Sequence, residues 1–143
     1  MKLTLYTDGG SRGNPGEAAS GIVIQDETGK TITEFGKYLG RQTNNYAEYM
    51  AIIFGFEKAK ELGADELLCF VDSKLVAEQL NRNWKVKEPT IQKLFLKAWK
   101  EMQQFKKVEI RHILRGGNIQ ADAQVNKILD EHQNGNPDDD MVI

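Results

Sequence analysis

Four acidic residues occupy positions from which their side chains could meet in one pocket. Asp8 and Asp72 each follow a predicted β-strand, and Glu48 and Asp122 each lie one turn inside a predicted helix. If both helices pack over the same edge of the sheet, the four carboxylates converge. Like charges raise one another's pKa, so such a cluster needs cations, and hard divalent ions with oxygen ligands suit it. Two Mg²⁺ ions about 3.5–4 Å apart would stabilise both oxygens of an in-line phosphoryl displacement.

Each of these residues also has a purely structural explanation. Asp8 could simply form a turn before a pair of glycines, and Asp72 could simply start a helix. Glu48 could be an exposed helix glutamate, and Asp122 could favour the dipole at a helix start. Spacing alone therefore leaves both interpretations open.

The elements that would position the cluster follow from the hydrophobic pattern. Residues 2–7 alternate and predict a strand that ends at Asp8, and residues 67–71 form a continuous apolar run, typical of a strand buried on both faces. A helix from Thr43 or Asn44 to about residue 62 joins these two strands, which we expect to be parallel through a right-handed crossover. Their carboxyl ends then form the kind of edge where open α/β sheets place their sites.

The rest of the chain completes an α/β domain, expected over residues 1–133. Four glycines and a proline between positions 9 and 16 predict a loop that a ligand can approach closely. An acidic tail is expected to be disordered over residues 134–143. The further expected elements are a hairpin of strands 21–25 and 31–38, helices from residue 73 to 81 and from about 89, a strand at 108–114, and a last helix from 118 to 132.

Composition limits the function classes. The chain has 143 residues, enough for one domain with a core. Its only cysteine, Cys69, lies in an apolar run, which excludes an internal disulfide and indicates a buried, inert thiol. No apolar run approaches the roughly 20 residues of a membrane span, and the first segment lacks a signal-peptide pattern. We therefore expect a cytoplasmic protein without a membrane partner. A monomer is the default expectation.

The charge is unevenly distributed. The net charge is −2, but residues 74–107 carry nine basic and three acidic side chains, a local excess of +6. Such asymmetry suggests a polyanionic partner, although a solvated helical face explains it equally well.

The four acidic residues lie in four short sequence blocks, which occur in this order: YTDGGSRGNPG, TNNYAEYMA, FVDSKLV and HILRGGNIQAD. Each block alone is weak, but together they cover the chain from about residue 3 to 130 and closely resemble the signature blocks of the ribonuclease H type 1 family. The resemblance implies an α/β ribonuclease H-like fold, a five-stranded mixed sheet of three antiparallel and two parallel strands flanked by helices. It also implies an endonuclease that hydrolyses the RNA strand of an RNA–DNA hybrid and leaves 3′-hydroxyl and 5′-phosphate ends.

The resemblance assigns roles to individual residues. Asp8, Glu48, Asp72 and Asp122 match the acidic quartet that binds two Mg²⁺ ions, or Mn²⁺ in their place. His112 matches a histidine on the loop before the last helix that aids turnover or product release; it also shares strand parity with core residues, so a structural role stays open.

The same blocks imply a surface for the hybrid. In this family Asn14, Asn44 and Asn45, with Ser11, contact the minor groove and RNA 2′-hydroxyls, and Thr43 holds a DNA phosphate. Amide side chains both donate and accept, which suits a 2′-hydroxyl, although turn or capping roles are the alternative. The residues that match the aromatic and basic channel along the DNA strand are Lys74, Trp84, Lys85 and Lys87.

The chain departs from many bacterial relatives at residues 83–88, which are too few for their basic, tryptophan-containing lobe. The chain therefore resembles the subgroup without this protrusion. Two rival functions fit parts of this pattern. A non-catalytic nucleic-acid-binding module would be marked by loss of one acidic residue, and all four are present. A nucleotide phosphate loop of the sugar-kinase and actin kind needs two such domains, and this chain has one.

Overall fold

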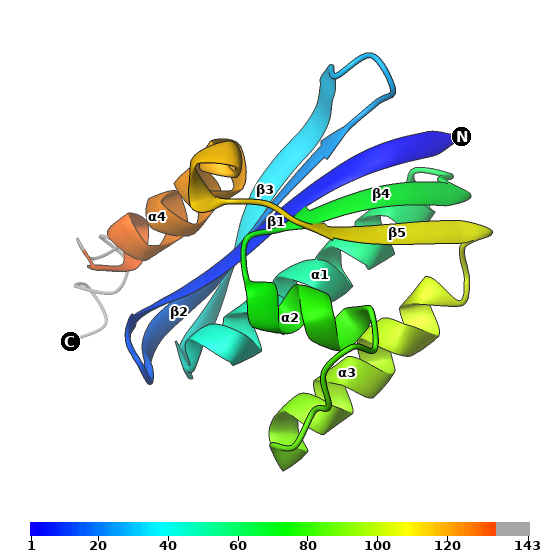
Figure 1. Cartoon of the computed structure of the whole chain (residues 1–143). Coiled ribbons are helices and arrows are strands. Elements are labelled where there is room, and N and C mark those ends of the chain that lie inside the picture. The colour runs from blue at the N-terminus through cyan, green and yellow to red at the C-terminus, as the bar shows by residue number, and fades with distance from the viewer. Residues whose placement is uncertain (134–143) are drawn as a thin grey trace.

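The computed structural model describes residues 1–133 and contains one mixed sheet of five strands in the order β3-β2-β1-β4-β5 (Figure 1). β1 pairs antiparallel with β2, which pairs antiparallel with β3, whereas β4 is parallel to both β1 and β5. The expected fold, three antiparallel and two parallel strands with helices, is confirmed. The strands are β1 (Lys2–Gly13), β2 (Gly16–Gln25), β3 (Thr31–Gln42), β4 (Glu66–Val71) and β5 (Lys107–His112).

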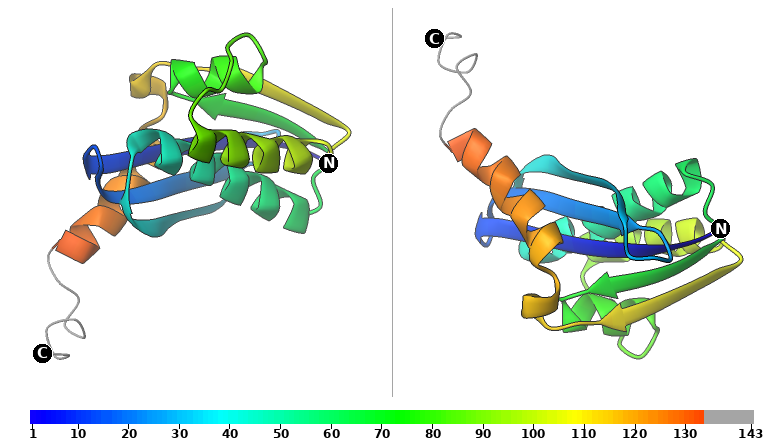
Figure 2. Two further views of the ribbon diagram at one scale, coloured as in Figure 1. Left: turned by 90° about the horizontal axis from the view of Figure 1, so that it is seen from below. Right: turned by 90° about the horizontal axis from the view of Figure 1, so that it is seen from above.

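Helices cover both faces of the sheet. Helix α1 packs on β1 and β2 and contacts α3, while α4 packs on β2, β3 and β1. Figure 2 shows α4 on the face opposite α1 and α3. No helix in the described part of the chain is long and apolar enough to cross a bilayer. The helices are α1 (Asn44–Glu61), α2 (Lys74–Leu80), α3 (Pro89–Met102), the short 3₁₀ helix η1 (Arg115–Gly117) and α4 (Ile119–Gln133).

The predicted bounds of the first three strands were wrong. β1 does not end at residue 7 but continues through Gly13, and β2 and β3 are correspondingly longer than residues 21–25 and 31–38. The predicted loop at residues 9–16 is mostly strand, because the main chain of Gly9 and Gly10 keeps its register with Ser20 and Ala19. Pairing depends on backbone groups, so glycine does not interrupt it.

Local signals at the helix ends were more reliable. The Thr43 side chain accepts a hydrogen bond from the Tyr46 N–H at the start of α1, as an N-cap does. Gly63 has φ +91° just beyond the end of α1, a conformation that favours glycine. Pro89 stands in the first turn of α3, where its missing N–H costs nothing.

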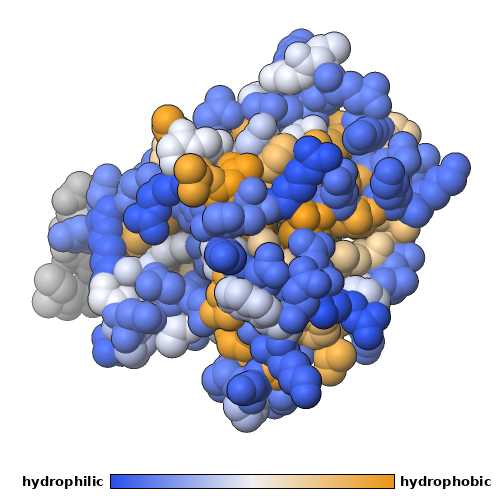
Figure 3. All heavy atoms as spheres, in the orientation of Figure 1, coloured by the Kyte–Doolittle hydropathy of each residue, from blue (hydrophilic) through white to orange (hydrophobic). Residues whose placement is uncertain are grey.

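The main core lies between the sheet and α1, α2 and α3, and its largest fully buried side chains include Tyr49, Phe56 and Ile52. Cys69 on β4 is buried there, and this burial raises the pKa of its thiol to about 12. On the face seen in Figure 3, hydrophobic residues form small groups among polar ones. The expected acidic tail, residues 134–143, lies outside the described residues.

Candidate active site

Two strand ends bring the first pair of carboxylates together. The parallel pairing of β1 with β4 ends at Thr7 and Val71, so Asp8 on β1 and Asp72 just after β4 are the residues that follow the last pair. β1 itself continues, paired only with β2. Asp8 therefore lies within a strand at the point where the neighbouring strand turns away, and Asp72 leads into α2.

Helix α1 brings Glu48 to the same point because β1 carries a glycine there. A Cβ on Gly9 would lie 2.2 Å from the main-chain carbon of Ala47, so only glycine permits this approach of helix and strand. The Ser20 hydroxyl on β2 donates a hydrogen bond of 2.8 Å to the Ala47 carbonyl. Glu48, the next residue of α1, also accepts a hydrogen bond from the backbone of Gly9.

Helix α4 approaches from the other face by the same means. A Cβ on Gly21 would lie 2.2 Å from the Ala121 carbonyl oxygen, so the first turn of α4 lies directly on β2. Asn118 begins this turn, since its carbonyl accepts the Asp122 N–H at 3.1 Å. Its buried amide donates to the Thr7 carbonyl at 2.8 Å and to Asp72 Oδ2 at 3.3 Å.

The four carboxylates converge in one cavity. Single carboxylate oxygens of Asp8, Glu48 and Asp72 all lie within 4.8 Å of one another, and the Asp122 side chain is hydrogen-bonded to Asp8. All four line a cavity of about 430 Å³. Its other lining residues are Gly9, Gly10, Ser11, Arg12, Asn44, Asn45, Ser73, Arg115, Val125, Asn126 and Leu129.

The cluster is electrostatically unfavourable as it stands. Burial, the charge of Asp72 and the contact with Asp122 raise the pKa of Asp8 to about 8. Burial and the charges of Asp8 and Asp72 also hold the pKa of Glu48 well above its usual range, although the hydrogen bond from Gly9 opposes this. The site therefore favours a cation or a proton over four free charges.

The donor set fits hard divalent cations. All four side chains offer oxygen ligands, which Mg²⁺ prefers, and none offers sulfur or imidazole nitrogen. Glu48 Oε2 is buried and has no hydrogen-bond partner among the described residues, so a ligand role would satisfy it. The residues that could hold such ions are Asp8, Glu48, Asp72 and Asp122.

Comparison with known proteins assigns the chain to a family. A family profile described as "Reverse transcriptase-like" matches residues 6–128. Ribonuclease HI of Halobacterium salinarum is 40% identical over 130 residues, which are 91% of this chain and 65% of that protein. The crystal structure of RNase H1 from the same archaeon superimposes with a TM-score of 0.89 at 38% identity and covers 91% of this chain and 98% of that one. The chain belongs to the ribonuclease H type 1 family.

Two further relatives extend this result. The bifunctional protein Rv2228c of Mycobacterium tuberculosis is 41% identical over 131 residues, which are 91% of this chain but 36% of that protein. LC11-RNase H1, solved in complex with an RNA/DNA hybrid, has a TM-score of 0.83 at 39% identity over 87% of this chain and 94% of that one. The chain thus spans less than two thirds of the length of the curated relatives named here.

The polar residues expected to contact a hybrid form a connected rim on one side of the ribonuclease H site. The Ser11 N–H donates to Asn44 Oδ1 at 2.8 Å, and the Asn44 N–H donates to Asn14 Oδ1 at 3.1 Å. Asn45 and Asn44 line the cavity, and Thr43 lies just before them as the cap of α1. Thr43 thus has the capping role, while the binding roles of Thr43, Asn44 and Asn45 stay a prediction.

The basic and aromatic residues lie apart from the carboxylates. Trp84 is 45% exposed and lines a separate groove with Lys85, and the Lys74 ammonium lies 5.9 Å from the centre of the Trp84 ring. Lys87 is exposed in the same segment. The structure thus brings Lys74 and Lys85 next to Trp84 and places none of the four residues on the lining of the acidic cavity.

His112 is exposed at the end of β5, so the alternative of a core histidine is wrong. Its Nε2 lies 3.2 Å from the Asp72 carbonyl oxygen, and its ring is not among the groups that line the cavity. Arg115, three residues later, does line it and makes no ion pair within residues 1–133. Sequence reasoning missed Arg115; the available signal was a cation in the short loop before the last helix.

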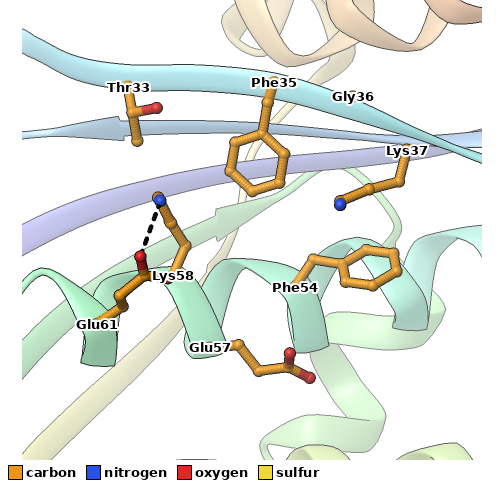
Figure 4. Close-up of a pocket in the computed structure, with 8 residues that line it drawn as sticks. All are labelled: Thr33, Phe35, Gly36, Lys37, Phe54, Glu57, Lys58 and Glu61. Carbon is orange, nitrogen blue, oxygen red and sulfur yellow. Dashed lines mark hydrogen bonds and ion pairs between the residues drawn. The ribbon is translucent and has the colours of Figure 1, made fainter.

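A second hollow lies between β3 and α1 and has a different character. Its walls include the rings of Phe35 and Phe54, with Lys37 above the latter, and Lys58 paired with Glu61 (Figure 4). Cations and anions are mixed there, and no described group of three metal-ligating side chains lies among its residues. The convergent chemistry of the molecule is therefore at the carboxylate cavity.

Proposed function

We propose that this protein is an endoribonuclease that hydrolyses the RNA strand of RNA–DNA hybrids with two divalent metal ions, leaving 3′-hydroxyl and 5′-phosphate ends. The observation that carries the proposal is the meeting of Asp8, Glu48, Asp72 and Asp122 in one open cavity, with a raised pKa at Asp8 and Glu48. Four carboxylates this close together repel one another, and such a cluster is typical of a site that binds divalent cations together with a polyanionic substrate. The hybrid bound to LC11-RNase H1 supports the substrate class.

The acidic residues would hold the ions. The chemistry that a bound pair of ions supplies is activation of water for in-line attack on phosphorus and stabilisation of the departing 3′-oxygen. Asp8 on β1 and Asp72 directly after the adjacent strand β4 form the sheet side of the site, while Glu48 and Asp122 enter from helices on opposite faces. Arg115 at the rim is placed to attract the phosphate backbone.

The amide rim would distinguish RNA from DNA. Asn44 uses its Oδ1 on Ser11, which leaves its Nδ2 group as the part of the amide that can donate to a ribose hydroxyl. Asn14 fixes the main chain of Asn44. This rim lies beside the carboxylates, so its amides can form hydrogen bonds with a 2′-hydroxyl next to the scissile phosphate. Thr43 would hold a phosphate of the DNA strand.

The finer assignments follow from the same residues. We infer Mg²⁺ as the resident ion, with Mn²⁺ as a substitute, because all ligands are oxygen atoms. Lys74, Trp84, Lys85 and Lys87 would receive the DNA strand in place of the absent protruding lobe. His112 would act in turnover from the end of β5, where its ring lies next to the Asp72 carbonyl. A monomer in the cytoplasm stays a prediction from the sequence.

The decisive experiment uses an RNA–DNA hybrid labelled on the RNA strand, compared with RNA–RNA and DNA–DNA duplexes, with Mg²⁺, with Mn²⁺ and with EDTA. We expect cleavage of the hybrid alone, dependent on metal, and no cleavage by Asp8→Asn or Asp72→Asn. Asp26→Asn is the matched control, because Asp26 is a half-buried residue of the turn between β2 and β3, is bonded to Thr28 and lies outside the carboxylate cavity.

A different result separates the alternatives. Tight binding of the hybrid with no cleavage in either metal would establish a non-catalytic binding module. Cleavage by Asp8→Asn at the parent rate would remove the carboxylates from the chemistry altogether.

A further inference from the structure

The segment between α2 and α3 is irregular but closely held. Residues 82–88 contain neither helix nor strand, yet they carry Trp84, Lys85 and Lys87. The segment starts at Arg82, whose φ is +65°, and the next two N–H groups, from Asn83 and Trp84, donate to the Glu78 carbonyl at 2.8 and 3.3 Å. Its course is therefore determined by groups of the flanking helices.

Two glutamines hold consecutive carbonyls of this segment from opposite sides. Gln79 of α2 donates from Nε2 to the Lys85 carbonyl at 3.3 Å. Gln92 of α3 donates from Nε2 to the Val86 carbonyl at 2.9 Å. The Val86 side chain packs on the core between them. Trp84 and Lys85 are left exposed beside the groove that all five residues line.

Gln79 also connects this segment to the helix of the active site. Its side chain is only 6% exposed, and its Oε1 accepts a 2.6 Å hydrogen bond from the hydroxyl of Tyr49, which is fully buried. Tyr49 directly follows Glu48 on α1. The amide accepts from Tyr49 at its oxygen and donates to the Lys85 carbonyl from its nitrogen, which a carboxylate or a thioether of similar length cannot do. A buried amide that lost either partner would cost free energy, so the arrangement is specified rather than incidental.

We propose that Gln79, with Gln92, is a positioning residue for substrate binding: it fixes the main chain at Lys85 so that Trp84 and Lys85 are presented as a preformed surface to the DNA strand of the hybrid. The inference rests on the proposed function and adds to it two residues that strengthen substrate binding by positioning Trp84 and Lys85. Preorganisation lowers the entropy that binding must overcome. Loss of either glutamine should therefore weaken binding of the hybrid and leave the chemical step unchanged.

The test compares three neutral variants of the full chain, Gln79→Met, Gln92→Met and Asn81→Leu. The third is the matched control: the Asn81 side-chain amide, at the same end of α2, donates to the Ile110 carbonyl of β5 at 3.1 Å instead of to a carbonyl of the segment. For the glutamine variants we expect KM for a labelled hybrid to rise about fivefold, with kcat within about twofold of the parent, as loss of one hydrogen bond implies. For Asn81→Leu both constants should equal those of the parent.

A second readout needs no catalysis. In a Trp99→Phe background, Trp84 is the only tryptophan, and iodide quenching of its fluorescence reports how well the segment is held. Quenching should increase in both glutamine variants and not in Asn81→Leu. Gln92 is exposed, so its variant tests the inference even if the buried Gln79 substitution impairs folding.

The outcomes are distinct. Unchanged KM and unchanged quenching in Gln79→Met and Gln92→Met would overturn the inference, as would an equal rise of KM in Asn81→Leu. If the parent itself fails to cleave the hybrid, the proposed function falls, and the quenching comparison still decides whether the glutamines position Trp84.

Discussion

Replacing Asp8 by asparagine should stabilise the fold when no divalent ion is present. Burial, Asp72 and Asp122 raise the pKa of Asp8 from 3.8 to about 8. The unfolded chain loses this proton near pH 3.8, whereas the folded chain keeps it up to about pH 8. The free energy of unfolding of the parent therefore falls as pH rises through this window, and below it the carboxyl group has no effect. Asparagine has no proton to lose and avoids the penalty.

The structure sets the size of the effect. Each pH unit inside the window lowers the free energy of unfolding by about 1.4 kcal/mol, which gives an upper limit of about 4 kcal/mol at pH 7. Water entering the open cavity and relaxation of the side chains reduce this limit, so we expect Asp8→Asn to gain about 2 kcal/mol at pH 7. The gain should shrink steadily toward pH 4, where both states of the parent are protonated.

The assay is urea unfolding followed by circular dichroism in EDTA at pH 4, 5.5 and 7, for the parent, Asp8→Asn and Asp26→Asn. Asp26 is the control of opposite sign, since its hydrogen bonds with Thr28 lower the pKa of its carboxyl group. Its replacement should bring no gain in stability as pH rises. Addition of Mg²⁺ should stabilise the parent and leave Asp8→Asn nearly unchanged, because the variant lacks one ligand.

Two results would refute this reasoning. The first is Asp8→Asn being less stable than the parent at pH 7 in EDTA, which would mean that the ionised carboxylate is favourably held. The second is a stability difference that does not depend on pH, which would place its cause in packing rather than in charge.

Three further changes test the same architecture. Asn118→Ala should lower the free energy of unfolding by about 1–3 kcal/mol in urea titrations and lower kcat at least about tenfold, because the carboxylate of Asp72 loses the amide that holds it. Gly9→Ala should cost about 1–3 kcal/mol or more by thermal unfolding, because the added methyl group would overlap the main chain of Ala47. Cys69 should not react with an aromatic disulfide reagent at pH 8 until the protein unfolds, since burial raises its thiol pKa to about 12.

The fold was predictable because its signals are local and consistent. The apolar run at residues 67–71 identified a central strand, and the capping residues Thr43 and Gly63 marked the ends of the crossover helix. A long helix between two strands then required a parallel pair. The bounds of β1 were not predictable in the same way, because its extension beyond Asp8 depends on pairing with β2, a partner distant from any local pattern.

The convergence of the acidic residues could be predicted from the sequence, but the residues that hold them in place could not. Asp8 and Asp72 were found because they follow the predicted strands 2–7 and 67–71. The sequence indicated only a helix cap at Asn118, not the hydrogen bond from its amide to Asp72. Arg115 lies in the fourth sequence block without a role assigned to it, and Gln79 lies in none of the four blocks. Their roles depend on which side chains lie opposite them, and that is set by helix packing.

The roles of Gly9 and Gly21 can be recognised only in the folded structure. In a sequence, Gly9 and Gly21 suggest turns, because glycine is valued there for its backbone freedom. In the structure both lie inside paired strands, in a backbone that any residue can adopt, and their contribution is the absence of a side chain. Each absence lets a helix lie against the sheet at a distance that a single carbon atom would prevent, on one face for α1 and on the other for α4. The four carboxylates can therefore meet only because two positions between them carry no side chain.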